Sequence, residues 1–101
     1  MSKEGIPIMA MEEKFDNGLE AVIRATGMFV SSDRTGMVKS ISKKVGDFLC
    51  GVITWKDVTD TIVDEVKYYA ADWWSDYASE QRACIANIKS YIYEFVMGSA
   101  A

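Results

Sequence analysis

The longest uninterrupted segment of this chain runs from Val52 to Met97, forty-six residues that contain neither glycine nor proline and lie between Gly51 and Gly98. Because glycine and proline interrupt helices most strongly, such a segment is typical of helical structure. A single helix over residues 55–97 would be a rod of about 64 Å. A compact chain of this length has a radius of gyration of only about 13 Å. We therefore expect a break near residues 75–79; a continuous rod, the alternative, would imply a dimer or a coiled coil.

The first half of the chain carries two further helical patterns. Apolar residues recur at three- and four-residue steps from Ile8, and Gly27 is a suitable end for this helix. A second amphipathic segment follows, and Gly51 is expected to close it. The apolar positions of the first segment are Met11, Phe15, Leu19, Val22, Ile23 and Thr26, and those of the second are Val38, Ile41, Val45, Phe48, Leu49 and Val52.

The connection between these two helices carries two conflicting signals. Residues 33–36 read Asp-Arg-Thr-Gly, which fits a type I turn with Asp in the first position and Gly in the fourth. Apolar residues on both sides of that turn leave a short hairpin over residues 28–38 as an alternative. We favour a helix, a loop and a helix, because helical spacing resumes at Val38.

The third and fourth helices have their own start signals. Thr54 stands three residues before Asp57, a weak capping box that predicts a helix from Trp55, and Ser79 is a candidate cap for the fourth helix. The expected apolar stripe of the third helix is Val58, Ile62, Val66, Tyr69, Trp73 and Tyr77, and that of the fourth is Cys84, Ile85, Ile88, Ile92, Phe95 and Val96. The sequence thus predicts an all-α fold, a compact bundle of three or four helices in one domain, residues 1–101, with a loose arm at 1–7. In a variant of this fold, the C-terminal half of the chain forms one long helix or a helical hairpin.

Charge is unevenly distributed along the chain. The local balances are −2 over residues 1–32, +3 over residues 33–44 and −5 over residues 45–101, which sum to the net charge of −4. Because phosphate binding needs a concentrated positive face, the acidic C-terminal half argues against direct binding of nucleic acid. A short basic patch is formed by Lys39, Lys43 and Lys44. We interpret it as the solvent-exposed side of a helix rather than as a membrane contact. The longest stretch without a charge, eight residues, is far too short to span a bilayer, for which about 18 are needed.

Several chemistries are disfavoured by the residues present. The chain has no histidine, which excludes histidine-based nucleophile activation and the usual zinc sites. Cys50 and Cys84 are 34 residues apart, and no secretory signal precedes them, so we expect two reduced thiols in a cytoplasmic protein, or in the host cytoplasm for a viral one. We predict no catalytic residues, no metal and no cofactor.

The candidate site is a column of acidic and aromatic residues on the third helix. Residues at i and i+4 lie on one side of a helix, where like charges repel. Aromatic side chains beside carboxylates have the composition of a protein-interface hot spot. One of Trp73 and Trp74, and one of Tyr68 and Tyr69, must lie outside the main stripe because neighbours on a helix diverge by about 100°. The predicted partner-binding residues are Asp60, Asp64, Tyr68, Asp72, Trp74 and Asp76.

These features predict a small, non-catalytic protein-binding module of the inhibitor or adaptor type, such as a phage or another mobile element encodes. Its partner would be another protein, with no membrane or direct nucleic-acid contact. One alternative is an acidic nucleic-acid mimic that blocks a DNA- or RNA-binding protein. Another is a self-assembling structural helical protein, for which a homodimer is the simplest form.

Overall fold

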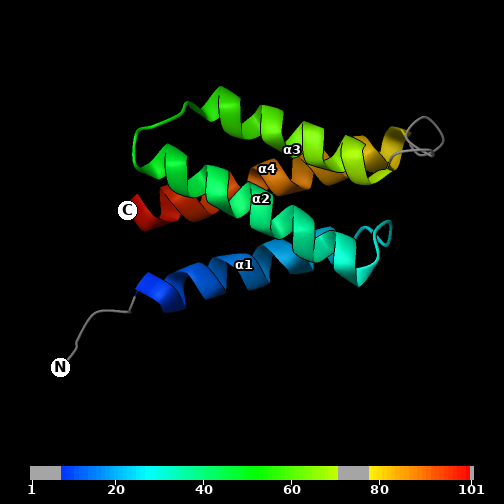
Figure 1. The fold of residues 1–101 in the computed structure, drawn as a ribbon, viewed down its shortest axis with the longest axis horizontal. Coiled ribbons are helices and arrows are strands. Elements are labelled where there is room, and N and C mark those ends of the chain that lie inside the picture. The colour runs from blue at the N-terminus through cyan, green and yellow to red at the C-terminus, as the bar shows by residue number, and fades with distance from the viewer. Residues whose placement is uncertain (1–7, 71–77, 101) are drawn as a thin grey trace.

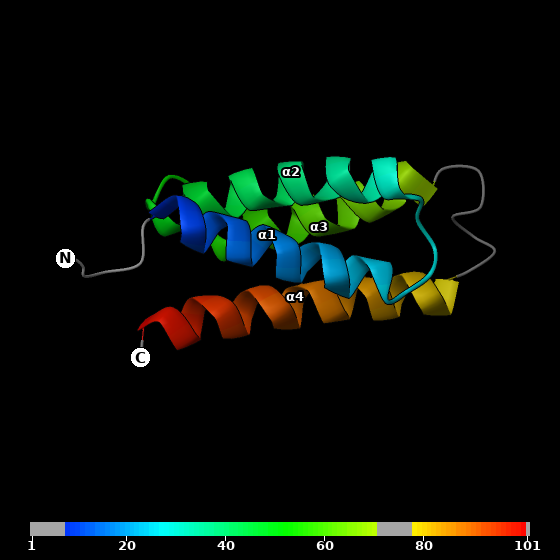
Figure 2. The same cartoon turned by 90° about the horizontal axis from the view of Figure 1, so that it is seen from below.

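The computed structural model describes residues 8–70 and 78–100, and over these ranges the chain is an antiparallel bundle of four helices. These are α1 (Ile8–Arg24), α2 (Ser31–Leu49), α3 (Trp55–Ala70) and α4 (Ala78–Ala100). Each helix packs against its neighbours in sequence, and α4 closes the ring by packing against α1. The long axes run nearly parallel, so the molecule measures 51 × 26 × 19 Å with a radius of gyration of 14.2 Å (Figures 1 and 2).

The core is a single cluster at the centre of the bundle, and all four helices contribute to it. Its residues come largely from the expected stripes, because the three- and four-residue spacing places them on one side of each helix. The buried apolar residues are Phe15, Leu19, Ile23, Phe29, Met37, Val38, Ile41, Val45, Val58, Ile62, Val66, Ala70, Cys84, Ile88 and Ile92. Gln81 is also buried, with 1% of its surface exposed. The predicted all-helical bundle is thus confirmed.

The antiparallel packing of α3 and α4 contradicts the continuous rod over residues 55–97. The hairpin over residues 28–38 is also wrong, since residues 31–38 are helical and the described ranges contain no strand. Residues 71–77, which include Trp73 and Tyr77 of the expected stripe, lie outside the described residues, as does the arm at 1–7.

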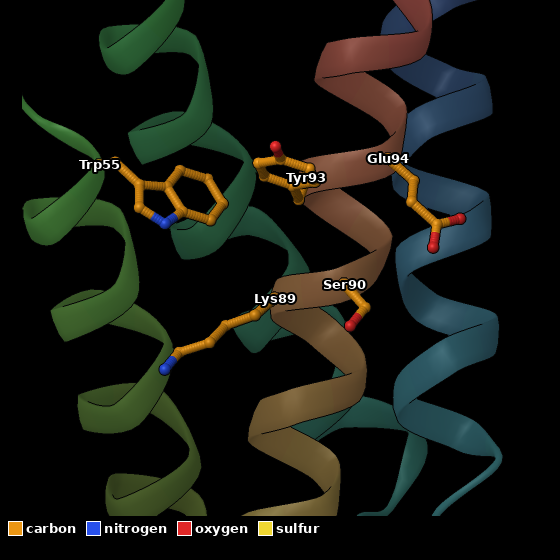
Figure 3. Close-up of a pocket in the computed structure, with 5 residues that line it drawn as sticks. All are labelled: Trp55, Lys89, Ser90, Tyr93 and Glu94. Carbon is orange, nitrogen blue, oxygen red and sulfur yellow. The ribbon is translucent and has the colours of Figure 1, made fainter.

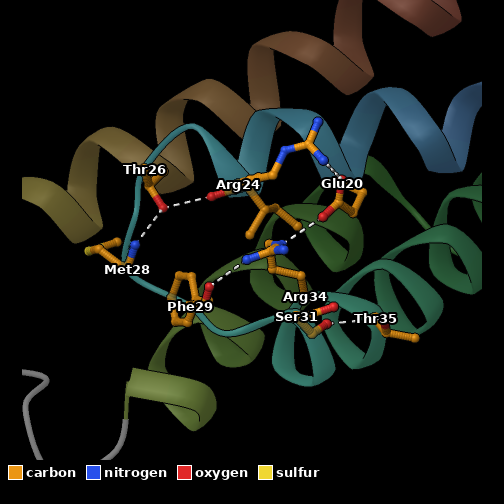
Figure 4. A network of polar contacts seen from close by, with 9 residues as sticks. Glu20, Arg24, Thr26, Met28, Phe29, Ser31, Arg34 and Thr35 are labelled. Atoms are coloured by element: carbon orange, nitrogen blue, oxygen red, sulfur yellow. Dashed lines mark hydrogen bonds and ion pairs between the residues drawn. The ribbon is translucent and has the colours of Figure 1, made fainter.

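The largest correction concerns the start of α2. We expected a turn at residues 33–36, yet α2 begins at Ser31 and these residues form its first turns. The reason is a contact distant in sequence: the Arg34 side chain, 17% exposed, pairs with Glu20 of α1 at 2.6 Å and donates to the Phe29 carbonyl at 2.7 Å (Figure 4). Asp33 lies near the positive end of the helix dipole, which favours a carboxylate there. These interactions hold the segment helical despite its turn-like composition.

The expected capping box is present at the start of α3. The Asp57 amide donates to Thr54 Oγ1 at 3.3 Å, and the Thr54 amide donates to Asp57 Oδ2 at 2.9 Å. Two backbone N–H groups at the helix start are thereby satisfied reciprocally. The ends of α1 and α2 also follow the prediction, because Gly27 and Gly51 adopt φ of 70° and 80°, the left-handed conformation in which glycine commonly ends helices.

Two glycines inside helices make room for tyrosine rings. Gly18 lies against Tyr91, and Gly36 lies against Tyr69; a Cβ at either position would come closer to the tyrosine hydroxyl than van der Waals contact permits. The Tyr91 hydroxyl donates to the Phe15 carbonyl at 2.8 Å, which ties α4 to α1. The helix-destabilising glycine at position 18 is therefore explained by packing of α1 against α4.

Three smaller predictions are wrong. Leu49 and Val52 were assigned to the buried stripe of α2, but they are 62% and 71% exposed. Val52 lies beyond the end of α2, so the helical spacing no longer directs its side chain to the core, whereas Leu49 is the last residue of the helix and is exposed at its end. Ser79 was a candidate N-cap, but α4 begins at Ala78 and includes Ser79.

Candidate protein-binding surface

The outward face of α3 carries the described part of the predicted site. Its core side is Val58, Ile62 and Val66, which are fully buried. A helix turns about 100° per residue, so Asp60, Asp64 and Tyr68 lie on the opposite side. All three are exposed, Tyr68 by 72%, and they follow one another at four-residue steps along the face. The structure thus brings these three predicted residues together on one accessible surface, which we call the α3 face.

The remaining predicted residues, Asp72, Trp74 and Asp76, lie outside the described residues. The described α3 face therefore consists of two carboxylates and one tyrosine, with Asp57 adjoining it near the start of the helix. The Tyr68 ring stands edge-on to Tyr69, with centroids 4.9 Å apart and planes at 88°. Tyr69 is half-buried and packs against the core, and its ring contacts Tyr68 on the side nearer the core. The prediction that only one of the pair faces the core is therefore confirmed.

Two of the acidic groups on this side are already engaged within the molecule. The hydrogen bonds from Thr54 lower the pKa of Asp57, which stabilises its ionised form. Asp60 pairs with Lys56 at 2.8 Å, and the hydrogen bond and attraction to Asp60 raise the pKa of Lys56. Both members of this pair are exposed, by 81% for Lys56 and 55% for Asp60. The column of carboxylates is thus partly neutralised at its N-terminal end, and the unneutralised charge lies toward Asp64.

The seam between α2 and α3 holds a further carboxylate that the sequence pattern did not single out. Glu65 Oε1 is shielded from solvent without a hydrogen-bond partner, while Ser40 of α2 hydrogen-bonds to the same side chain. Burial raises the pKa of Glu65, and the negative charge of Asp64 raises it further, although the Ser40 hydrogen bond opposes both effects. Glu65 is therefore part of the packing between helices and not of the exposed α3 face.

A second exposed surface lies at the end of the bundle where α2 ends and α3 begins. Trp55 packs edge-to-face against Tyr93 of α4, with ring centroids 6.2 Å apart, and against Phe48 at 5.6 Å. A shallow depression of about 240 Å³ opens beside these rings, lined by Trp55, Lys89, Ser90, Tyr93 and Glu94 (Figure 3). Sequence reasoning missed it because its residues come from two helices and Tyr93 was not part of any stripe.

Two of the three lysines in the basic patch on α2 are exposed, as we expected, while the third, Lys44, is partly buried. Lys39 and Lys43 are exposed, and Lys43 pairs with Asp47 one turn along the helix at 3.5 Å, a distance at which an exposed pair contributes little. Within the described ranges, no three His, Cys, Asp or Glu side chains gather closely enough to hold a metal ion. None of the helices described is both long enough and apolar enough to cross a membrane.

Comparison with known proteins adds no family to this description: no family model, no curated protein and no solved structure matches the chain.

Proposed function

We propose that this protein is a small protein-binding module of the inhibitor or adaptor type, which docks through the α3 face on a basic surface of another protein. The observation that carries this proposal is the arrangement of Asp60, Asp64 and Tyr68 on one exposed side of α3. Tyrosine supplies a large amphipathic contact surface and is enriched among interface hot spots. The carboxylates favour a positively charged partner and raise the rate of encounter with it.

The two cysteines, which are not bonded to each other, support a place in the cytoplasm. Cys50 is exposed and Cys84 is buried, and both are free thiols. Free thiols are the usual state in the cytoplasm, whereas secreted small domains commonly carry disulfides. We propose the cytoplasm, of the organism or of a host cell, as the compartment in which the partner is met.

Mimicry of a nucleic-acid backbone is the second candidate function. The four-residue steps of Asp60, Asp64 and Tyr68 set acidic and polar groups about 6 Å apart along the helix, and this regular spacing favours mimicry. The ion pair between Lys56 and Asp60 weakens it, because a mimic works through unneutralised charge. For a mimic, complex formation falls steeply with salt, and reversal of Asp64 weakens binding more than loss of Tyr68 does.

The test is a side-by-side capture from lysate with four immobilised proteins: the natural chain, Tyr68→Ala, Asp64→Lys and the control Glu13→Lys. Glu13 is exposed on α1, so its reversal changes the net charge as Asp64→Lys does but leaves the α3 face intact. The proposal expects one protein retained by the natural chain and the control and lost by both α3 variants. Retention of the same proteins by all four would refute it.

A further inference from the structure

The solvent side of α4 carries a second regular stripe, and this stripe contains no charged residue. The core side of α4 is formed by Gln81, Cys84, Ile88 and Ile92, which are all buried. On the opposite side, successive steps of four, three, four, three and four residues mark six exposed positions. These positions, which we call the outer α4 stripe, are Ser79, Ala83, Ala86, Ser90, Tyr93 and Met97.

Alternating three- and four-residue steps are the spacing by which two helices pack side by side in a coiled coil. Tyr93 and Met97, the two large side chains of the stripe, are 55% and 50% exposed. The small residues Ala83, Ala86 and Ser90 would let a second helix approach closely. Among the described residues, Trp55 of α3 contacts the edge of the stripe at Tyr93, but all six stripe positions stay exposed and are available to a partner.

The charges beside the stripe favour a second copy of this chain as that partner. Lys89 lies on the side of α4 that faces α3, and Glu94 lies on the side that faces α1 (Figure 3). The seven positions of a coiled-coil repeat are lettered a to g, and the a and d positions form the contact stripe. In a parallel pair of identical helices, the α3 side of one helix meets the α1 side of the other. The g position of one helix then faces the e position five residues further along the other. Lys89 and Glu94 occupy this pair of positions when Ser90 is an a position and Tyr93 a d position. Two symmetric contacts, Lys89 to the copy's Glu94 and the reverse, then form.

An antiparallel pair has the opposite result. There, like sides of the two helices meet, so Lys89 would face Lys89 and Glu94 would face Glu80 of the copy, and both contacts are repulsive. The charge pattern therefore selects the parallel orientation, which a two-fold axis along α4 generates.

The depression beside the stripe supports the same arrangement. In a parallel coiled coil, a residue at a d position enters a hole formed by four residues of the facing helix. For Tyr93 this hole is formed by Ser90, Tyr93, Glu94 and Met97 of the copy. Ser90, Tyr93 and Glu94 also line the depression of about 240 Å³, which Trp55 closes on its α3 side. The depression thus shares three of the four residues of this hole, while Lys89 and Trp55 extend it toward α3 and Met97 does not line it.

We propose that this chain forms a parallel two-fold homodimer through the outer α4 stripe, with reciprocal Lys89–Glu94 ion pairs flanking it. The proposal does not depend on binding through the α3 face, because that face is made of other residues on another helix.

Sedimentation equilibrium of the natural chain and of charge variants tests the proposal. The natural chain is expected to dimerise with a Kd of about 100 µM or tighter. Lys89→Glu or Glu94→Lys alone turns both ion pairs into repulsive contacts and should weaken dimerisation about tenfold or more. An equimolar mixture of these two variants restores both attractive contacts and should recover dimers of natural strength. The control is Lys39→Glu, a charge reversal at an exposed position of α2, which should leave dimerisation unchanged.

A natural chain that remains a monomer overturns the proposal, and so does a mixture that fails to recover dimers. A second readout covers the case in which a charge variant does not fold. In a Cys50→Ser background, Ser90→Cys lies next to its copy in the parallel dimer and should form a disulfide-linked dimer on mild oxidation. Asn17→Cys, exposed on α1, is the control. Equal cross-linking at both positions contradicts the assigned face.

Discussion

Replacement of Gly18 by Ala should destabilise the bundle, although the same change stabilises an isolated helix. Alanine is favoured over glycine in a helix interior by about 1 kcal/mol. In this fold, however, the new Cβ would overlap the Tyr91 hydroxyl and ring. Tyr91 would have to move, which sacrifices its 2.8 Å hydrogen bond to the Phe15 carbonyl.

The magnitude follows from the contacts that Tyr91 would lose or distort. The hydrogen bond contributes about 1 kcal/mol. The Tyr91 ring also contacts the rings of Phe15 and Phe95, with centroid distances of 5.4 Å and 6.0 Å. Each such aromatic contact contributes about 0.5–1.5 kcal/mol beyond burial. Partial loss of these contacts costs about 2–3 kcal/mol, and the gain in helix propensity offsets about 1 of it. The expected net loss is about 1–2 kcal/mol, or a fall in Tm of roughly 5–15 °C.

Gly46→Ala is a matched control for this prediction. Gly46 is also inside a helix, α2, but a Cβ there meets nothing within 4 Å. This variant should gain about 0.4–1 kcal/mol. Urea unfolding of the natural chain and both variants, followed by circular dichroism at one protein concentration, gives the two free energies of unfolding. Stabilisation by Gly18→Ala equal to that by Gly46→Ala would refute the close packing of Tyr91 on α1.

The remaining predictions concern single side chains. Arg34→Met should cost about 1–2 kcal/mol in urea unfolding, because it removes the 2.6 Å ion pair with Glu20 and the 2.7 Å hydrogen bond to the Phe29 carbonyl, while Arg24 stays paired with Glu20 at 3.2 Å; a loss near zero would contradict the role given to this residue. Thr54→Ala should cost about 1 kcal/mol by the same assay through loss of the N-cap, and an unchanged midpoint would exclude the capping box. Glu65 has a raised pKa in the fold, so its stabilising contribution is present in acid and lost as pH rises through that pKa; Glu65→Gln should therefore be more stable than the natural chain at pH 7 and no more stable below about pH 4. A thiol reagent at pH 8 should modify exposed Cys50 quickly and buried Cys84, whose pKa is raised to about 11, only on unfolding, whereas equal rates would contradict the burial of Cys84.

Local signals in the sequence were sufficient for most of the fold. The reciprocal bonds of Thr54 and Asp57 involve residues three apart, so a local motif predicts them. The glycines that end α1 and α2 act in the same way, since their backbone conformation is decided within one turn. Stripes at helical spacing predicted the core because burial of one side of each helix stabilises the fold more than any other term.

The start of α2 could not be predicted in this way. Residues 33–36 have turn composition, and their helical conformation depends on a contact of Arg34 with Glu20, fourteen residues earlier. Local patterns carry no information on such a pair. Exposure of Val52 was missed for a related reason, since the apolar pattern continues past Leu49, the residue at which α2 ends.

The candidate sites also differ in whether local sequence patterns could predict them. The α3 face lies on one helix, so residue spacing alone placed Asp60, Asp64 and Tyr68 together. The depression at Trp55 and Tyr93 requires knowledge of which helices are neighbours, and the sequence gives no direct measure of that.

The most direct test of the account is the affinity of the purified partner for the natural chain and for Tyr68→Ala, measured by calorimetry at low and moderate salt. Tyr68 is exposed, so its loss should leave Tm unchanged, while a hot-spot tyrosine contributes about 2 kcal/mol to binding. The account predicts a Kd about 30-fold weaker for Tyr68→Ala. An unchanged Kd would show that the partner binds elsewhere and would contradict docking through the α3 face.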